Sequence, residues 1–303
     1  MAERRARPVV FYRYFPLSMR DRKWGLFVTT TGETLMAPNQ PYPPAGHPKQ
    51  YDFKWAQGRV LHDHQAIYIS HGRGWLETAH TPRQPVEMGT VFLLFPGVWH
   101  RYMPDPRTGW REHWVGFDGE TARRWMKEKF FSPRKPILQA RDEDLLLTLY
   151  ARILETAKAN EPALQQVLAG TVSQIVGLLY SAQQARFSGQ LQSRSAVQRA
   201  IERMQSARQS EFDLPALARE LHVSYSWFRR MFARHTGLSP HQYVLELKLV
   251  RARNLLSGTE LTVKEVARQT GFVDEHYFCR LFGKKTGLTP SQWRSRSSVT
   301  QQR

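Results

Sequence analysis

Cysteine is almost absent from this sequence, and its scarcity excludes several kinds of protein. Cys279 is the only cysteine among 303 residues, so the chain cannot form an internal disulfide or a cysteine-rich zinc site. A redox switch built on this thiol would usually need a second thiol as its partner. We therefore expect Cys279 to be a small contact residue, with a redox switch as the weaker alternative.

Long apolar segments are missing as well. No uninterrupted apolar run approaches the roughly 18 residues that cross a bilayer. The N-terminal sequence MAERRARPVVFYRYF also lacks the sustained apolar core of a secretion signal. The sequence therefore predicts a cytoplasmic protein.

Acidic residues are few in comparison with basic ones. The chain has 44 Lys and Arg against 26 Asp and Glu, which gives a formal net charge of +18 at pH 7. Such an excess attracts polyanions, among them DNA and anionic membrane surfaces. Because no single basic amphipathic helix dominates, we expect double-stranded DNA as the partner and not a membrane.

One helical pattern occurs twice between Leu214 and Trp293. Phe228 and Phe278 correspond at an offset of 50, whereas Ala218 and Ala267 correspond at an offset of 49. The second copy therefore has one extra residue in the turn between its helices, where an insertion is tolerated.

Each copy has the signals of a helix, a tight turn and a second helix. In the first copy Asp213 and Ser224 can cap the two helices, and in the second Thr262 can open a capping box. Gly271 marks the turn of the second copy. His222 stands at the matching position of the first copy, and we expect it to adopt the same left-handed conformation, which histidine tolerates better than most residues.

The outward faces of the second helices carry side chains that can contact DNA bases. Arg can donate to both major-groove acceptors of guanine, Glu can accept from cytosine, and Ser or His can make single contacts. The alternative is a pair of solvated helical hairpins with ordinary surface charges. The candidate DNA-binding residues are Ser226, Arg229 and Arg230 in the first copy and Glu275, His276, Cys279 and Arg280 in the second.

This repeated region resembles the double helix-turn-helix domain of the AraC family of bacterial transcription regulators. The resemblance rests on Gly271-Phe272, Tyr277-Phe278, Arg280, Phe282 and Gly287-Leu288-Thr289-Pro290. It implies about seven helices, with one long helix, here Pro240 to Leu256, joining two motifs whose recognition helices enter successive segments of the major groove. The family's base-contacting positions fall on the candidate residues named above. Val273 departs from the small polar residue usual at its position, so we expect the second recognition helix to start at Asp274.

The first part of the chain has a different pattern. From Val9 to Phe117, short alternating or apolar runs are ended by turns that contain Gly or Pro. Many short strands without an intervening helix predict a β-sandwich or a closed barrel. Gly89, Pro96-Gly97 and His100 resemble the second conserved segment of cupin barrels. The pattern also resembles the ligand-binding domain of AraC-type regulators that respond to sugars.

Histidines raise the question of a metal site in this barrel. His62, His64 and His100 could supply three imidazoles, because alternate residues of a strand share one face and His100 would come from a facing strand. The acidic ligand expected four to five residues after His64 is missing, since Tyr68 and Ile69 stand there. We therefore expect no metal, no other cofactor and no enzymatic activity. The alternative is a metal-dependent cupin enzyme that acts on a sugar and is fused to a DNA-binding domain.

Without a metal, the barrel would hold a small polar effector. A sugar is bound by an aromatic ring against its apolar face and by fixed polar groups at its hydroxyls. Trp114 would supply the ring, and Arg59, His71, His100 and Tyr102 are the other candidate ligand-binding residues. The resemblance places Tyr102, Trp114 and His71 where arabinose-responsive relatives hold the pentose, although His71 replaces an arginine. The alternatives are that Trp114 belongs to the core and that Arg59 forms a surface ion pair.

Two helices are predicted between the domains, at Asp142 to Lys158 and at Pro162 to Arg186. The second helix has a narrow apolar seam of coiled-coil type. Its members are Leu164, Leu168, Thr171, Ile175 and Leu178. We expect the seam to face a second subunit, as the family resemblance also suggests, and a helix pair buried wholly within one chain is the alternative.

Together these patterns predict an α+β protein with two domains and a connector. The expected parts are a cupin-like ligand-binding domain at residues 1–140, dimerisation helices at 141–187, a linker at 188–195 and a double helix-turn-helix domain at 196–303. The predicted function is that of a sequence-specific transcription regulator of the activator type that responds to a sugar. Its partners would be double-stranded DNA, the effector, a second copy of the chain and RNA polymerase.

Overall fold

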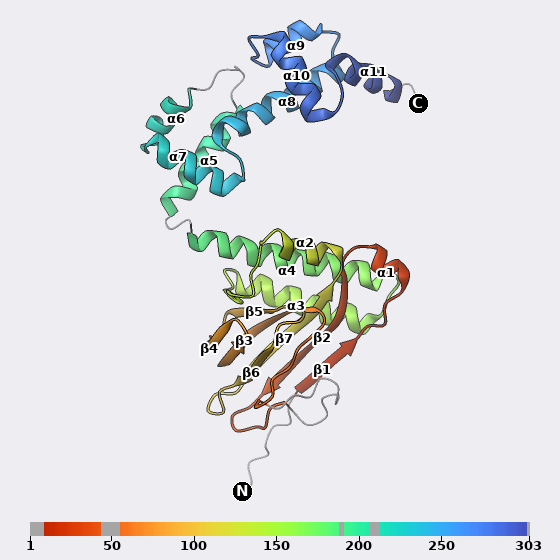
Figure 1. Cartoon of the computed structure of the whole chain (residues 1–303), viewed down its shortest axis with the longest axis vertical. Coiled ribbons are helices and arrows are strands. Elements are labelled where there is room, and N and C mark those ends of the chain that lie inside the picture. Colours follow the sequence, from red (N-terminus) through yellow and green to blue (C-terminus); the bar gives the residue numbers. More distant parts are fainter. Residues whose placement is uncertain (1–8, 44–54, 188–190, 207–212, 302–303) are drawn as a thin grey trace. The chain divides into compact units, whose positions relative to one another are not determined.

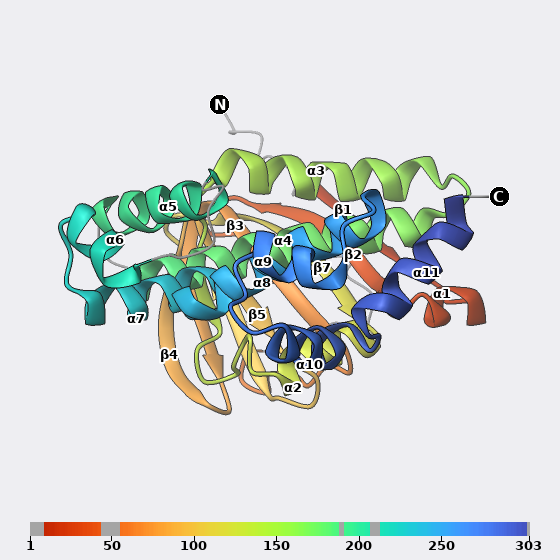
Figure 2. The ribbon, with the colours of Figure 1, turned by 90° about the horizontal axis from the view of Figure 1, so that it is seen from above.

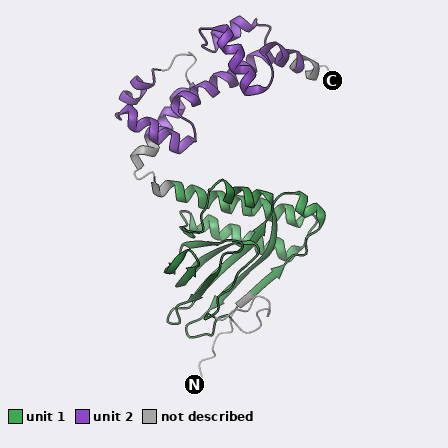
Figure 3. Cartoon of the chain, in the orientation of Figure 1, with its two compact units in different colours: residues 1–186 green, residues 187–303 purple. Residues whose placement is uncertain are grey.

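The computed structural model describes residues 9–43, 55–187, 191–206 and 213–301. The chain divides into two compact units, residues 1–186 and 187–303 (Figure 3). The first is rich in strands and the second is helical, which confirms the predicted α+β class. None of the helices in the described ranges is long and apolar enough to cross a membrane.

The first unit contains an antiparallel sheet in which β3 is the central strand. The first part of β3 pairs with β5 and β7, and its second part pairs with β4 and β6, while β7 continues through β2 to β1 and β5 continues to β8. The strands are β1 (Val9–Tyr14), β2 (Phe27–Met36), β3 (His64–Thr78), β4 (Thr81–Glu87), β5 (Thr90–Leu94), β6 (His100–Pro104), β7 (Trp110–Asp118) and β8 (Ile137–Gln139).

Alternation along the strands separates two cores, one on each face of this sheet. On β3, Ile67 and Ile69 point to one core, and Ala66 and Tyr68 point to the other. The core of Ile67 and Ile69 draws side chains from β2, β5, β6 and β7, so the sheet curls around it. We call this sheet the barrel and this core its interior.

The other face of the barrel is covered by helices. These are α3 (Glu143–Ala159) and α4 (Leu164–Phe187), which lie side by side, with the shorter α1 (Met19–Lys23) and α2 (Glu120–Lys127) nearby (Figures 1 and 2). The Tyr150 hydroxyl of α3 donates to the Ala66 carbonyl at 3.1 Å, and its ring stacks on Tyr68 with centroids 5.9 Å apart. Burial of these aromatic rings fixes α3 on the sheet.

The predicted seam of α4 faces inward, so the expectation that it meets a second subunit is wrong. Leu168 and Ile175 are fully buried in the core that α4 shares with the barrel, and Thr171 is 7% exposed. The alternative, a helix pair buried within one chain, describes these residues. The opposite side of α4 remains exposed at Val167, and α3 is exposed at Leu147.

The second unit has seven helices in its described residues. They are α5 (Leu191–Ser206), α6 (Leu214–Glu220), α7 (Tyr225–Thr236), α8 (Pro240–Gly258), α9 (Val263–Gln269), α10 (Glu275–Thr286) and α11 (Pro290–Gln301). Of the predicted linker, residues 188–190 lie outside the described residues, and residues 191–195 belong to α5 instead. Leu, Gln and Arg in this stretch favour a helix, and no proline interrupts it.

Two separate cores in the second unit meet different parts of α8. The first is formed by α5, α6 and α7 with Tyr243, Val244 and Leu247 of α8. The second is formed by α9, α10 and α11 with Leu249 and Leu256 of α8, among others. One continuous helix therefore joins two helix-turn-helix lobes, as Figure 1 shows for α8.

The helix caps predicted from the sequence are confirmed. The Asp213 and Ser224 side chains accept from Ala216 N and Trp227 N, and Thr262 forms its capping box with Glu265. His222 has φ of +56° and Gly271 has φ of +77°, so both turns use the left-handed conformation. Asp274 caps α10, which begins at Glu275, so Asp274 marks the start of the second recognition helix as predicted.

Candidate ligand pocket and DNA interface

A polar cluster inside the barrel contains three of the predicted ligand-binding residues. Arg59 and His100 form two backbone hydrogen bonds of 2.9 Å each, which fixes the start of β6 against the segment that precedes β3. The Arg59 guanidinium donates to the Tyr102 hydroxyl at 2.7 Å and lies 5.4 Å from the centroid of the Tyr102 ring. Arg59, His100 and Tyr102 are therefore brought together.

His100 is a neutral imidazole in this cluster. Burial lowers the pKa of His100 to about 4, and the positive charge of Arg59 adds to this effect. Its Nδ1 lies 3.0 Å from the Val98 carbonyl, so Nδ1 carries the hydrogen and Nε2 is left as an acceptor. The Arg59 Nε stands 3.4 Å from that Nε2. The His100 imidazole therefore stays in one protonation state around neutral pH.

A buried carboxyl group lies in the same interior. Glu112 is 5% exposed, and the Tyr42 hydroxyl lies 3.2 and 3.3 Å from its two carboxyl oxygens. Burial raises the pKa of Glu112 to about 8, against the opposing effects of the Tyr42 hydrogen bond and the Arg59 charge. A protonated Glu112 can both donate and accept, which suits the hydroxyl of a neutral ligand.

Two tryptophans complete the interior. Trp114 is 9% exposed, and its ring lies over Gly32 of the neighbouring strand β2 so closely that an added Cβ would collide with it. Trp110 is fully buried between Tyr42 and Tyr102, with ring centroids 5.8 and 6.1 Å away. The Trp110 indole N–H has no hydrogen-bond partner among the described residues. A buried unpaired donor is costly, so this N–H is a natural contact for a ligand oxygen.

His71, the remaining predicted ligand residue, is exposed and lies outside this cluster. The expectation that it joins the pocket is wrong because the pairing of β3 with β7 shifts between Ile69 and His71. Such a bulge interrupts the alternation of faces from which the prediction was made. The next residue, Gly72, has φ of +78°.

The three histidines considered as metal ligands are also separated. His62 is exposed and precedes β3, which begins at His64, so the two do not share a strand face. His64 lies on the helix-covered face, where its ring stacks on Phe117, whereas His100 lies in the interior. Among the described residues no group of three or more His, Cys, Asp or Glu side chains is placed to hold a metal ion.

Sequence reasoning missed Glu112, Tyr42 and Trp110. Glu112 alternates with Trp110 and Trp114 on one strand, so the period of two places all three on one face. This alternation can be read from the sequence, but it does not identify which face of the strand lies in the interior. Tyr42 had no such signal, because it reaches the cluster from the irregular segment that follows β2.

The helices α7 and α10 carry the predicted DNA-binding residues on their outer faces. Phe228 and Phe232 of α7 are fully buried, as are Phe278 and Phe282 of α10, which fixes the rotation of each helix. The predicted residues with exposed side chains are Ser226, Arg229, Arg230, His276 and Arg280. Among these predicted residues, the helix α7 thus presents two exposed arginines and α10 presents one, in keeping with contacts to bases or phosphates.

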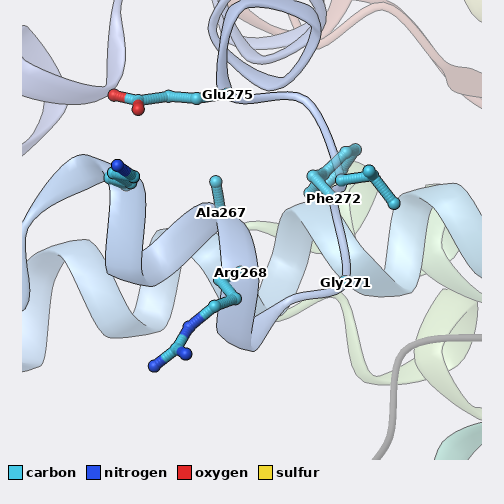
Figure 4. A pocket seen from close by; sticks show the side chains of 7 residues that line it. Ala267, Arg268, Gly271, Phe272 and Glu275 are labelled. Carbon is cyan, nitrogen blue, oxygen red and sulfur yellow. The ribbon is translucent and has the colours of Figure 1, made fainter.

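Glu275 and Cys279 are only partly exposed. Cys279 packs against the second core of the unit, and burial, followed by the nearby Glu275 charge, raises the pKa of its thiol. A raised pKa keeps the thiol protonated and disfavours a redox switch. Glu275 lines a concavity of about 380 Å³ together with Ala267, Arg268, Gly271 and Phe272 (Figure 4).

The turn before α10 is held by contacts from α8. The Lys248 ammonium donates to the Gly271 carbonyl at 2.7 Å and lies over the Phe272 ring at 5.4 Å. Lys285 of α10 also pairs with Glu246 of α8 at 2.6 Å. These contacts tie the second recognition helix to the helix that joins the two lobes.

Comparisons with known proteins agree with both units. The family described as an AraC-like ligand binding domain matches residues 40–201, and the family described as a helix-turn-helix domain matches residues 217–296. The Msm operon regulatory protein of Streptococcus mutans is 24% identical over 253 residues, covering 80% of this chain and 88% of that protein. The lactose operon transcription activator of Staphylococcus xylosus is 23% identical over 259 residues, covering 82% and 88%. The MmsAB operon regulatory protein of Pseudomonas aeruginosa is 28% identical over 246 residues, covering 78% and 77%.

Proposed function

Because the chain belongs to the AraC family of DNA-binding transcription regulators, we propose that it activates transcription in response to a sugar bound inside its barrel. The similarity to the lactose operon transcription activator supports both the activating role and the class of effector. The observation that carries the proposal is the unpaired Trp110 indole N–H, which lies buried in an interior that also holds a cation, an acid and stacked aromatic rings.

The composition of this interior favours a neutral polyhydroxylated ligand. Trp114 and Trp110 offer aromatic faces for the apolar side of a sugar ring, and Tyr42 and Tyr102 lie beside them. Arg59 supplies fixed N–H donors, and a protonated Glu112 supplies both a donor and an acceptor. A sugar acid would bring a carboxylate next to Glu112, which is unfavourable for either group when ionised.

The effector can be identified by thermal unfolding of the full-length protein. Pentoses, hexoses, sugar acids and polyols are each added in excess, with and without a chelator. A ligand at one hundred times its dissociation constant adds about 2.7 kcal/mol to the stability of the unit that binds it. We expect one neutral sugar to stabilise the protein regardless of chelator. Stabilisation by no sugar, or loss of stability on chelation, would favour the metal-dependent alternative.

We also propose that a second copy of the chain covers the exposed side of α3 and α4. Leu147 is 40% exposed and Val167 is 43% exposed, although both belong to helices that otherwise pack closely on the barrel. Exposed apolar side chains on neighbouring helices are a natural start for a two-fold interface. Equilibrium sedimentation that detects only monomer at micromolar concentration would refute this proposal.

DNA recognition is assigned to α7 and α10 in the proposed function. In helix-turn-helix proteins the recognition helix lies in the major groove, and its N-terminal residues contact base edges. Ser226 and His276 lie in the first turns of α7 and α10, and Arg229, Arg230 and Arg280 follow within the next turn. Binding of the protein to a selected duplex, compared with binding to a random duplex, measures how much of the affinity depends on sequence.

A further inference from the structure

The one extra residue of the second helix-turn-helix motif is Val273. In the first motif Val223 N donates to the Ala218 carbonyl, and in the second Phe272 N donates to the Ala267 carbonyl, so Val223 and Phe272 are equivalent. Each packs against the core of its lobe. The cap residue Ser224 follows Val223 directly, whereas Val273 is inserted between Phe272 and the cap residue Asp274.

Val273 makes little contact with the rest of the fold. Its side chain is 95% exposed, more than any other large apolar side chain among the described residues. The folded state gains almost nothing from burying it, and Asp274 caps α10 without its help. A single exposed valine needs no explanation by itself. The position of Val273 does call for an explanation, because this residue directly precedes the helix assigned to DNA recognition.

The surroundings of Val273 are suited to a DNA duplex. It lies on the rim of the concavity lined by Glu275, and the same concavity is lined by Lys264 and Arg268 of α9, both exposed. In helix-turn-helix complexes the first helix crosses the phosphate backbone while the start of the second enters the major groove. Lys264 and Arg268 would then face phosphates, and a side chain just before α10 would face base edges.

We propose that Val273 reads sequence through an apolar contact with the C5-methyl group of a thymine. The thymine methyl is the apolar group that base edges present in the major groove, and apolar side chains recognise it there. The contact would add a thymine preference beside the polar contacts of Glu275, His276 and Arg280. The inference rests on the proposed recognition of bases by α10. It predicts that only the second motif makes such a thymine contact, because the first motif has no residue equivalent to Val273 and its Val223 packs against the core of its lobe.

The test removes the C5-methyl group from the thymine and the two γ-methyl groups from the valine. A high-affinity duplex is first selected from a random pool with the full-length protein, and each thymine is then replaced by deoxyuridine, which lacks only the C5-methyl. We expect one thymine in the segment bound by α10 to lose about fourfold in affinity for the unaltered protein, the value of one buried methyl-sized group. Val273→Ala should bind the thymine and the uracil duplexes equally. Val250→Ala, at an exposed valine on α8, is the matched control and should keep the difference.

The remaining outcomes separate this inference from the proposed function. If no thymine substitution is sensitive to Val273→Ala while Arg280→Ala still weakens only the selected duplex, α10 reads bases and the thymine contact is refuted. If Arg280→Ala weakens selected and random duplexes equally, α10 does not read bases, and the proposed function fails there together with the inference. If Val273→Ala binds every duplex normally but lowers transcription by purified RNA polymerase, Val273 contacts the polymerase and the inference is refuted.

Discussion

Replacing Glu112 by glutamine should remove a specific part of the pH dependence of stability. Glu112 is almost completely buried, and burial raises the pKa of its carboxyl from an ordinary 4.5 to about 8. Between these two values the folded protein holds one proton that the unfolded chain has released. The contribution of Glu112 to the free energy of unfolding is therefore fully present below pH 4.5 and is lost as the pH rises towards 8.

The expected loss is large enough to measure. Each pH unit in that interval costs about 1.4 kcal/mol for one proton, and the slope flattens close to the folded-state pKa. Between pH 6.5 and 8 the total is about 1.5 kcal/mol. Glu112→Gln keeps the size of the side chain and cannot ionise, so the free energy of unfolding of this variant should lack that loss over the same interval.

This pH window is chosen because buried histidines act in the opposite direction. Burial lowers the pKa values of His100 and His113 to about 4, so the unfolded chain binds protons below pH 6.5 that the folded protein does not. Their contribution is present above pH 6.5 and is lost as the pH falls towards 4. At pH 6.5 each of these histidines is still half protonated in the unfolded chain, so each adds about 0.4 kcal/mol to the stability of both proteins between pH 6.5 and 8. The contribution of Glu112 is therefore the difference between the pH profiles of the two proteins.

Urea unfolding followed by tryptophan fluorescence is a suitable assay. Seven of the nine tryptophans lie before residue 187, so the signal reports mainly on the barrel. The free energy of unfolding is compared at pH 6.5, 7.2 and 8 for the original protein and for Glu112→Gln. Identical pH slopes for the two proteins would mean that Glu112 is ionised in the folded state, and the account of the barrel interior would be wrong.

Further predictions concern other parts of the chain. Arg230→Ala and Arg280→Ala should each weaken binding to a selected duplex by about 1 to 3 kcal/mol in fluorescence anisotropy, and an equal loss on random DNA would identify them as phosphate contacts. Trp114→Ala should abolish stabilisation by the effector in thermal unfolding, whereas Trp114→Phe should retain part of it; an unchanged response would place the effector elsewhere. His222→Gly should stabilise the second unit by about 1 kcal/mol in urea unfolding, because His222 has φ of +56°, and a loss of stability would contradict this. Val167→Asp should shift the protein to monomer in equilibrium sedimentation if the exposed side of α4 is an interface.

The helix-turn-helix unit could be predicted from the sequence because its signals are local. Ser224 and Asp274 are caps recognisable from residue type and position alone, and the buried phenylalanines recur at helical spacing. Even the left-handed conformation of His222 followed from its alignment with Gly271. The sequence does not identify Val273 as the extra residue, because the change of offset from 49 to 50 places the insertion only somewhere in the turn. The hydrogen bonds from Val223 N to the Ala218 carbonyl and from Phe272 N to the Ala267 carbonyl place it after Phe272.

The barrel interior was harder to predict because β7 is buried on both faces. Glu112 and His113 are adjacent on this strand and are 5% and 3% exposed, so hydropathy does not tell which of them faces the interior. The tertiary arrangement decides, since α3 covers the His113 side and Tyr42 reaches the Glu112 side.

The same ambiguity explains the wrong assignment of the α4 seam. A stripe at spacings of three and four predicts that a helix buries one face, and it does not identify what lies on that face. Leu168 and Ile175 are covered by the chain's own barrel core. The exposed Val167 on the other side of α4 carries no periodic signal that would have distinguished it.

The arrangement of α8 limits how an effector could act on DNA binding. Its 19 residues, at about 1.5 Å each, span about 28 Å, close to the roughly 34 Å of one helical turn of DNA. Each lobe packs its own core against a different part of this continuous helix, and Lys248 and Lys285 tie the second lobe to it. The distance between α7 and α10 within one chain is therefore set by a rigid element that the barrel does not contain. An effector that alters DNA binding must then act on where the whole helical unit can be placed, or on which second copy it is paired with, and not on the spacing of its two recognition helices.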